Sequence, residues 1–410
     1  MNLSAYFKGV SVKRLSSHEV DPKVSRGHEF QGVKSLQDFL GIPAERRTIP
    51  AVYLWLTDDE SPVRLDLQAT WYDSRAGQAH RGPETRLYYP AEAEEIVHRA
   101  RDGDTLFVCL RSDDSLMFLL CPSGSAIEQQ LLWLFGLEAP VEVLRPRLLG
   151  NDNAPEIGFA ARYVLDLIEV EIPVTEEAWL DKLLAAFGTS FPSTDRFSRF
   201  ARDAAGEVDL QGDPDGSLMR WLDFEERLFL TLERHLISQR LTDGFVRDAA
   251  VDVDGFIQFS LSVQNRRKSR AGYSLENHLG EIFKARNLAF ERGAATEGKK
   301  KPDFLFPGSV AYHDALFPVN ALTLLGSKSS CKDRWRQVLS EGERIPQKHL
   351  ITLEPGISVA QTGEMQGSGL QLVLPAPLHE TYRAEQRDWL MDLAGFIAMA
   401  TERQAAGLRG

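Results

Sequence analysis

The stretch Lys299-Lys-Lys-Pro-Asp303-Phe-Leu-Phe306 places a carboxylate at the opening of a short apolar run of the kind that forms β-strands. A second apolar run, Leu324-Leu-Gly-Ser-Lys328, ends on a lysine. If the two runs form adjacent strands, the aspartate and the lysine meet at one edge of a sheet. The C-terminal half is therefore predicted to contain a sheet with an acid and a base side by side.

Helices and strands are predicted to alternate around these two runs. Leucines recur at helical spacing in 218–240 and 274–286, which predicts two amphipathic helices. The remaining predicted elements are strands at 303–306 and 321–325, a helix at 335–345, strands at 350–353 and 370–374, and a helix at 387–403. This order indicates a mixed β-sheet flanked by helices.

The first 165 or so residues have a different pattern, dominated by short strands. Strand-like runs occupy 51–56, 63–67, 105–110 and 116–121, and helical stretches occupy 33–40 and 92–101. This pattern predicts a small barrel-like or α+β unit. Clusters of Pro, Gly and Asp near 191–195 and 211–216, with a short helix at 176–187, mark a connection. We therefore expect an N-terminal domain at 1–168, a linker at 169–215 and a C-terminal domain at 216–410.

The chain is acidic overall but contains one basic segment. Its 410 residues are 43% hydrophobic and carry a net charge of -12, which by itself argues against a nucleic-acid partner. Between Asn265 and Arg336, however, 14 Lys and Arg stand against 7 Asp and Glu. Such a segment is either an ordinary solvated face or a surface that binds phosphates.

Three features lead us to expect a cytoplasmic protein without a membrane segment. Only Cys109, Cys121 and Cys331 are present, without the CxxC spacing of a zinc site, and this fits a reducing compartment. The first residues lack the basic-then-apolar build of a signal peptide. No apolar run approaches the roughly 20 residues that a membrane helix needs.

Asp303 and Lys328 belong to a set of side chains that suits metal-dependent phosphodiester hydrolysis. That reaction needs a divalent cation on oxygen ligands, and Mg²⁺ favours one or two carboxylates. Glu341, in the predicted helix 335–345, can supply the second carboxylate, and a lysine can stabilise the anionic transition state. Glu276 is a third candidate, as a ligand or a water-orienting group. Each residue taken singly is common in turns, strand ends or solvated helices, and only the combination favours a Mg²⁺ site.

Two basic clusters in this half could face DNA. Asn265-Arg266-Arg267-Lys268-Ser269-Arg270 precedes the predicted helix 274–286 and suits phosphate contacts. Cys331-Lys332-Asp333-Arg334-Trp335-Arg336 follows Lys328, and its arginines and aspartate could read a G·C pair. The alternative for the second cluster is a local ion-pair network at a helix start.

The N-terminal part also contains polar segments that either grip a DNA groove or form ordinary exposed loops. They lie at 13–14, 27–28, 71–75 and 78–86. The candidate DNA contacts in them are Lys13, Arg14, His28, Tyr72, Arg75, Arg81, Glu84 and Arg86.

At these residues the chain resembles the EcoRII-type restriction endonucleases. The resemblance covers about residues 262–385 and is most specific at Ser262-Val-Gln-Asn-Arg-Arg-Lys-Ser-Arg-Ala-Gly272, Thr296-Glu-Gly-Lys-Lys-Lys-Pro-Asp-Phe-Leu-Phe-Pro307 and Cys331-Lys-Asp-Arg-Trp-Arg-Gln337. The N-terminal third is similar more loosely, through Val12-Lys-Arg-Leu-Ser16 and Trp71-Tyr-Asp-Ser-Arg75.

The resemblance implies a PD-(D/E)XK nuclease core in the C-terminal half and a B3-like pseudobarrel in the N-terminal half. It implies that the N-terminal domain binds DNA separately and obstructs the catalytic cleft until it binds a second copy of the site, which is type IIE behaviour. A homodimer through the catalytic domains, a target centred on CCWGG and a paired cytosine methyltransferase follow from the same resemblance.

Carried over by position, Asp303 and Glu341 would bind Mg²⁺ and Lys328 would complete the site. The DNA contacts would include Arg266, Lys332, Asp333 and Arg334. Gly326 departs from the broad nuclease pattern because it stands where the second acid of (D/E)XK would be. The EcoRII-like subgroup supplies that acid from the helix, which favours Glu341.

The sequence thus predicts a type II endonuclease, of type IIE as the resemblance implies, that cuts double-stranded DNA at a short specific sequence. An alternative is a sequence-specific DNA-binding regulator whose nuclease core no longer cuts.

Overall fold

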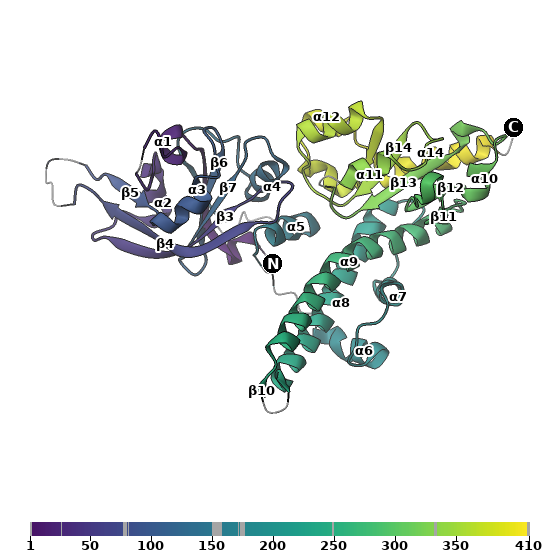
Figure 1. Ribbon diagram of the computed structural model, residues 1–410, viewed down its shortest axis with the longest axis horizontal. Coiled ribbons are helices and arrows are strands. Elements are labelled where there is room, and N and C mark those ends of the chain that lie inside the picture. The colour runs from purple at the N-terminus through teal and green to yellow at the C-terminus, as the bar shows by residue number, and fades with distance from the viewer. Residues whose placement is uncertain are drawn as a thin grey trace. The chain divides into compact units, whose positions relative to one another are not determined.

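The computed structural model describes residues 2–25, 27–76, 80, 82–149, 158–170, 172, 177–247, 250–331 and 334–407. The chain divides into two compact units, each with its own sheet (Figure 1). The N-terminal unit comprises Met1–Glu171 with Pro355–Thr362 and Thr381–Arg383, and the C-terminal unit comprises the rest. Both units mix helices and strands, which confirms the predicted α+β class.

Short elements make up the N-terminal unit. In chain order they are η1 (Leu3–Ala5), β1 (Phe7–Arg14), α1 (Ser17–Val20), β2 (Glu29–Phe30), η2 (Val33–Leu36), α2 (Gln37–Leu40), β3 (Arg47–Trp55), β4 (Val63–Asp73), β5 (Thr85–Tyr88), η3 (Ala91–Ala93), α3 (Glu94–Val97), β6 (Thr105–Arg111), β7 (Leu116–Cys121), α4 (Ala126–Phe135), β8 (Arg145–Leu148) and α5 (Phe159–Leu167).

Eight strands of this unit form one mixed sheet in the order β2-β5-β4-β3-β7-β6-β1-β8. Only the β3–β7 pair is parallel. Along β4 the side chains alternate, with Ala69 and Trp71 buried in the core and Gln68, Thr70 and Tyr72 on the other face. One face of the sheet thus packs against the core and the other carries polar and aromatic side chains.

The remaining elements continue from residue 177 onward. They are α6 (Glu177–Phe187), α7 (Thr194–Ala204), α8 (Pro214–Asp243), β9 (Val246–Arg247), β10 (Ala250–Val251), α9 (Val253–Ala285), β11 (Glu291–Arg292), η4 (Glu297–Lys299), β12 (Phe304–Phe306), α10 (Ser309–His313), η5 (Val319–Ala321), β13 (Thr323–Lys328), α11 (Trp335–Leu339), β14 (Lys348–Thr352), α12 (Val359–Gly367), β15 (Leu370–Val373), η7 (Ala376–Thr381), α13 (Ala384–Arg387) and α14 (Leu393–Gly407).

The second sheet has the strand order β11-β12-β13-β14-β15. The pairs up to β13 are antiparallel, and β13, β14 and β15 run parallel. Its core is aromatic: the ring of Phe283 from α9 lies 5.2 Å from Phe304 and 5.3 Å from Phe306, centre to centre. Phe396 of α14 packs on Phe306 at 5.6 Å. These contacts fix α9 and α14 against the sheet.

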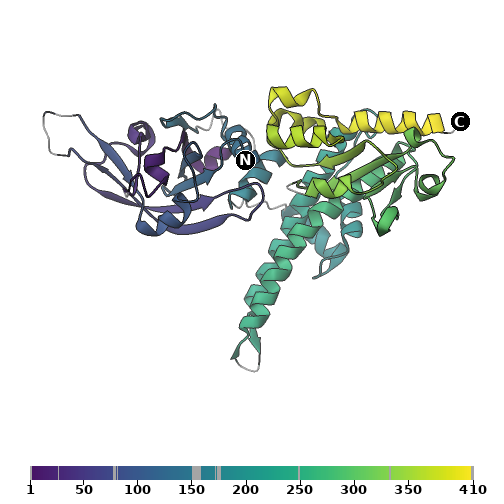
Figure 2. The same ribbon diagram turned by 45° about the horizontal axis from the view of Figure 1, so that its top comes forward.

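Helices α8 and α9 form a long hairpin whose far end, with β9 and β10, extends away from the sheet (Figures 1 and 2). The hairpin packs against α6 and α7 around a second core, in which Leu183, Phe197, Leu228 and Leu232 are buried. The segment expected to be a linker, 169–215, therefore contains two helices that pack onto the hairpin.

Three expected boundaries in this half were wrong. Helix α9 begins at Val253, well before the expected start at 274, so Arg266 to Arg270 lie inside a helix and not ahead of one. Helix α11 ends at Leu339, so Glu341 lies in the turn after it. The expected last helix, 387–403, is divided into α13 and α14.

Within the described residues, no helix has the length and the apolar character needed to cross a membrane.

Asp215 joins three segments of the C-terminal unit and generates a prediction about stability. Its buried carboxylate accepts hydrogen bonds from the backbone N–H groups of Ala376 (3.0 Å), Leu393 (2.8 Å) and Ala394 (2.9 Å). We expect Asp215→Ala to lower the free energy of unfolding by about 2–4 kcal/mol, because it leaves buried donors unpaired. Urea denaturation measures this. Asp203→Ala, at an exposed position of α7, should stay within about 0.5 kcal/mol of the wild type.

Candidate active site

Asp303 and Lys328 meet at the edge of the second sheet, as the sequence predicted. Antiparallel pairing of Phe304 with Leu325 sets Asp303 beside the last residues of β13. One carboxylate oxygen of Asp303, Oδ2, accepts from the Lys328 ammonium at 2.7 Å and from the Ser327 backbone N–H at 2.7 Å. The side chains of Asp303 and Lys328 are 20% and 17% exposed, so the pair is partly shielded but open to a ligand.

Glu341 carries the second carboxylate next to this pair. It follows α11 in a turn that its own N–H closes by donating to the carbonyl of Val338 at 3.1 Å. Burial, with the charge of Asp303 as the next contributor, raises the pKa of Glu341, while Lys328 opposes this shift. Its Oε2 is buried and has no hydrogen-bond partner among the described residues. A buried carboxylate oxygen without a partner is costly, and a bound cation would satisfy it.

Glu276, on α9, is the third carboxylate of the site. Arg292 of β11 donates to its Oε2 at 2.8 Å and to the side-chain oxygen of Asn277 at 3.1 Å. Burial raises the pKa of Glu276; the Arg292 hydrogen bond opposes that shift and the charge of Asp303 adds to it. Arg292 was not predicted from the sequence, and it fixes the orientation of Glu276 relative to Asp303.

These carboxylates fit a hard divalent cation. In the described part of the chain, no group of three or more His, Cys, Asp or Glu side chains is arranged to hold a metal ion. The fit therefore depends on Asp303 and Glu341. Two carboxylates are enough for Mg²⁺, because this ion binds one or two protein carboxylates and keeps several of its water ligands. The unpartnered oxygen of Glu341 supports this fit. Glu276 is held by Arg292 at the side of the pair.

Lys300 and Glu297 connect the segment before Asp303 to the segment around Glu341. The Lys300 ammonium donates to the carbonyl of Ser340 at 2.6 Å. A carboxylate oxygen of Glu297 accepts from the N–H of Glu343 at 3.2 Å. Ser340 and Glu343 lie on either side of Glu341 in the chain. The segment before Asp303 therefore holds the turn that carries Glu341.

The packing around Gly326 accounts for the lack of an acid at this position of β13. A Cβ built on Gly326 would lie 2.6 Å from Cγ2 of Val338, which is buried on α11. Valine is stiff, so the helix leaves no space for any side chain at Gly326. The close packing of α11 on β13 thus excludes an acid at 326 and brings the following turn, with Glu341, to the site.

The cluster at 266–270 is largely engaged inside the molecule. Arg267 donates to Glu233 at 2.6 Å, and Arg270 is 11% exposed, 3.5 Å from Glu225. The Arg266 guanidinium stacks over the ring of Phe191 at 4.2 Å, and Lys268 is exposed. These side chains lie on α9 of the helical hairpin, and Arg270 packs against Glu225 of α8.

The second cluster follows Lys328 directly. Lys332 and Asp333 lie outside the described residues. Arg334 is exposed and donates to the carbonyl and hydroxyl of Ser330 at 2.8 and 2.7 Å. Arg336 pairs with Glu364 at 2.8 Å. Arg334 thus stands at the surface a few residues from the acid–lysine pair.

Two of the predicted DNA contacts in the N-terminal unit are engaged in its interior. The Lys13 ammonium is 2% exposed and donates to Glu19 at 2.8 Å and to the carbonyl of Gln31 at 2.9 Å. Arg14 donates to Thr105 and Glu128. These contacts favour a structural role for both cations.

The other N-terminal candidates gather on the outer face of β4 and β5. Tyr72 lies opposite Arg86, Arg75 pairs with Glu84 at 2.6 Å, and Arg86 contacts Glu84 at 3.1 Å. His28 lies nearby, 2.6 Å from Glu94 and stacked on Tyr89 at 5.5 Å. Arg81 lies outside the described residues.

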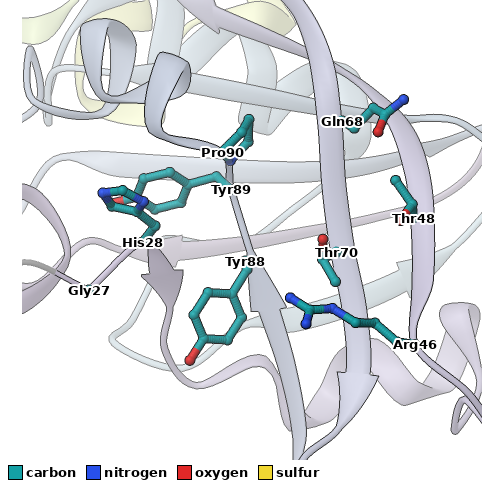
Figure 3. A pocket seen from close by; sticks show the side chains of 9 residues that line it. All are labelled: Gly27, His28, Arg46, Thr48, Gln68, Thr70, Tyr88, Tyr89 and Pro90. Carbon is teal, nitrogen blue, oxygen red and sulfur yellow. The ribbon is translucent and has the colours of Figure 1, made fainter.

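A hollow on this face contains residues that the sequence did not indicate. Its volume is about 520 Å³, and its lining includes His28, Arg46, Gln68, Thr70 and Tyr88 (Figure 3). The Arg46 guanidinium reaches toward the Tyr88 ring (Figure 3) and lies over Tyr72 at 5.1 Å. The polar residues alternate with apolar ones along 63–73, and this period of two could have located the face from the sequence.

Comparison with known proteins locates the similarity in the C-terminal half. Residues 229–397 match the family model described as EcoRII C terminal. The type II restriction enzyme EcoRII of Escherichia coli is 46% identical over 212 residues, which are 52% of this chain and 51% of that relative. The chain thus matches about half the length of this curated relative.

Two solved structures are among those to which the chain is similar. Metal-depleted Ecl18kI in complex with uncleaved, modified DNA has a TM-score of 0.45 at 15% identity, covering 57% of this chain and 86% of that chain. The restriction endonuclease PspGI–substrate DNA complex has a TM-score of 0.42 at 13% identity, covering 53% of this chain and 94% of that chain.

The contact between Gly326 and Val338 predicts a steric effect. Gly326→Ala should lower the free energy of unfolding by about 1–3 kcal/mol, because the added methyl group collides with a stiff buried side chain. Urea denaturation measures the loss. Gly363→Ala is the matched control, since a Cβ at this helical glycine meets nothing within 4 Å. Equal stability of Gly326→Ala and the wild type would contradict the steric account.

Proposed function

We propose that this chain, whose residues 229–397 carry an EcoRII C-terminal domain, is a type II restriction endonuclease that cuts double-stranded DNA at a short specific sequence. The meeting of Asp303, Lys328 and Glu341 at one sheet edge carries the proposal. The 46% identity to EcoRII over half of the chain supports it.

The proposed cofactor is Mg²⁺. Asp303 and Glu341 would hold it, and when bound it would supply charge neutralisation at the scissile phosphate and acidify a water. The donor set supports this, because both groups offer hard oxygen ligands and Glu341 has a buried oxygen without a partner.

Lys328 and Glu276 have complementary roles in this proposal. The ammonium of Lys328, which is bonded to Asp303, would donate to a phosphate oxygen and stabilise the charge that develops there. The carboxylate of Glu276, whose pKa is raised by burial, would orient the attacking water or accept its proton. Arg292 limits the movement of that carboxylate.

Sequence recognition is proposed for the segment after Lys328. Exposed Arg334, with Lys332, Asp333 and Arg336, would contact bases and phosphates of a CCWGG-like target. Lys268 would add a phosphate contact from α9. The net charge of -12 supports selectivity, because it limits the sequence-independent attraction to DNA.

The N-terminal unit is proposed to be a B3-like effector domain that binds a second copy of the site. His28, Tyr72, Arg75, Glu84 and Arg86 support this, because they share one polar, aromatic face. In the type IIE arrangement this unit would inhibit the catalytic site until its own DNA is bound. Arg81 would belong to the same surface.

The proposal extends to partners and setting. A homodimer would supply one active site for each DNA strand, and a cytosine methyltransferase would protect the host's own sites. The proposed compartment is the cytoplasm, where the three buried cysteines would stay reduced.

An inactive, DNA-binding regulator is the alternative. The shared contacts of Asp303 and the unpartnered oxygen of Glu341 favour the nuclease.

Replacement of Asp303 tests the nuclease proposal. Asp303→Ala should lower plasmid cleavage in Mg²⁺ by at least about 1000-fold, because it removes a metal ligand and the partner of Lys328. Binding to site-bearing DNA in a gel-shift assay should persist. EDTA should abolish cleavage by the wild type.

Asp314→Ala, at an exposed position of the same unit, is the control and should cut normally. If the wild-type protein binds the site but does not cut it with any divalent metal, the alternative of a DNA-binding regulator is correct.

The effector proposal is tested with the full chain. A short duplex carrying the site, added in trans, should accelerate cleavage of a single-site plasmid. Arg86→Ala should raise the duplex concentration for half-maximal stimulation by roughly tenfold, through loss of one charged DNA contact. Arg99→Ala removes an exposed charge elsewhere on the same unit and should leave stimulation unchanged. A cleavage rate that does not change when the duplex is added would argue against type IIE behaviour.

A further inference from the structure

Glu354 is a buried acid that the proposed chemistry does not use. It lies two residues past the end of β14 and is 7% exposed, so its carboxylate is largely shielded from solvent. One carboxylate oxygen, Oε2, accepts a hydrogen bond from the backbone N–H of Cys331. A buried carboxylate is costly unless hydrogen bonds compensate for the water it has lost, so this contact constrains both segments.

The sheet places Glu354 next to the segment that follows the proposed catalytic lysine. Lys328, the last residue of β13, pairs in register with Thr352, the last residue of β14. The two parallel strands thus end side by side, and the chain leaves both of them at the same edge of the sheet. The N–H of Glu354 donates to the hydroxyl of Thr352 at 3.2 Å, which keeps Glu354 close to the strand end. From there its carboxylate reaches Cys331, which follows Lys328 by three residues.

Cys331 connects this buried acid to an exposed arginine. Its carbonyl accepts a hydrogen bond from the N–H of Arg334 at 2.7 Å. The guanidinium of Arg334 is exposed and donates to the carbonyl and hydroxyl of Ser330. In the chain Arg334 stands between two buried residues, Cys331 and Trp335, which anchor it on both sides. A single residue thus bonds to Glu354 through its N–H and to Arg334 through its carbonyl.

We infer that Glu354 is a positioning residue for sequence recognition: by holding Cys331 it fixes the point from which Arg334 approaches a base pair. The inference rests on the proposed function, in which Arg334 contacts the target DNA. Lys328 and Arg334 are six residues apart, so a fixed Cys331 keeps the reading side chain in one position relative to the proposed catalytic one. Direct readout needs such support, because paired hydrogen bonds between a guanidinium and a guanine tolerate little displacement.

Loss of the contact between Glu354 and Cys331 should reduce discrimination between DNA sequences. Contacts to phosphates supply much of the affinity for DNA and carry no sequence information. A displaced Arg334 can still contact a phosphate, although it no longer matches one particular base pair. We therefore expect weaker binding to the correct sequence and nearly unchanged binding to other sequences. A residue that only stabilised the fold would lower binding to all sequences alike.

Binding by the full chain in EDTA tests the inference without requiring cleavage. The target is the sequence that the wild-type protein enriches from a library of random duplexes, and the competitors replace each of its G·C pairs in turn. The measured quantity is the ratio of the two dissociation constants. Glu354→Ala should lower this ratio by about tenfold at one G·C pair, which is the scale of one base contact. Glu402→Ala removes an exposed acid of α14 and should leave the ratio unchanged.

Two conservative variants and a double variant separate positioning from stability. Glu354→Gln keeps an acceptor at the same reach and should retain most of the discrimination. Glu354→Asp keeps the charge but withdraws the carboxylate by one methylene group, so it should lose discrimination; it also serves if Glu354→Ala does not fold. In Arg334→Ala the reading group is gone, so adding Glu354→Ala or Glu354→Asp should lower the ratio no further. Additive losses would assign Glu354 to another role and overturn the inference.

The outcomes distinguish this inference from the proposed function. A wild-type protein that enriches no sequence would overturn both. A wild type that discriminates, with Glu354→Ala and Glu354→Asp variants that discriminate equally well, would overturn only the role of Glu354. The same conclusion follows if these variants weaken binding to all duplexes by one common factor. A wild type that selects a sequence without cutting it would remove the nuclease proposal and leave the role of Glu354 open to the same binding ratios, which then support or overturn it.

Discussion

A single carboxylate oxygen, Oδ2 of Asp303, holds the proposed active site together. It accepts from the ammonium of Lys328 and from the backbone N–H of Ser327, which ties the start of β12 to the end of β13. Backbone pairing of β12 with β13 fixes the strand ends from which Asp303, Ser327 and Lys328 follow. A carboxylate held in this way keeps its other oxygen in a defined direction.

The surrounding packing follows from this constraint. Gly326 lets α11 approach β13 closely enough that Val338 occupies the space of a side chain. The turn after α11 then delivers Glu341 to the same edge, and Lys300 fixes that turn through the carbonyl of Ser340. On the other side Arg292 holds Glu276. Three separate segments thus bring acids near one another, and the segments of Glu276 and Glu341 are anchored by Arg292 and Lys300.

The sequence predicted the sheet and the acid–lysine pair because a short apolar run with a polar end can be recognised from neighbouring residues alone. It placed Glu341 in a helix, since the run after Trp335 has helical spacing that the turn at 340 interrupts. It missed the first part of α9, whose apolar stripe faces outward within one chain. The roles of Arg292 and Lys300 depend on distant segments meeting, and no local pattern encodes such a meeting.

Crystals grown with Mn²⁺ in place of Mg²⁺ would test the central claim most directly, by the anomalous scattering of the bound ion. The account predicts one strong peak within coordination distance of both Asp303 and Glu341, which Asp303→Ala removes. A peak elsewhere in the chain, or none at saturating Mn²⁺, would contradict the proposed site.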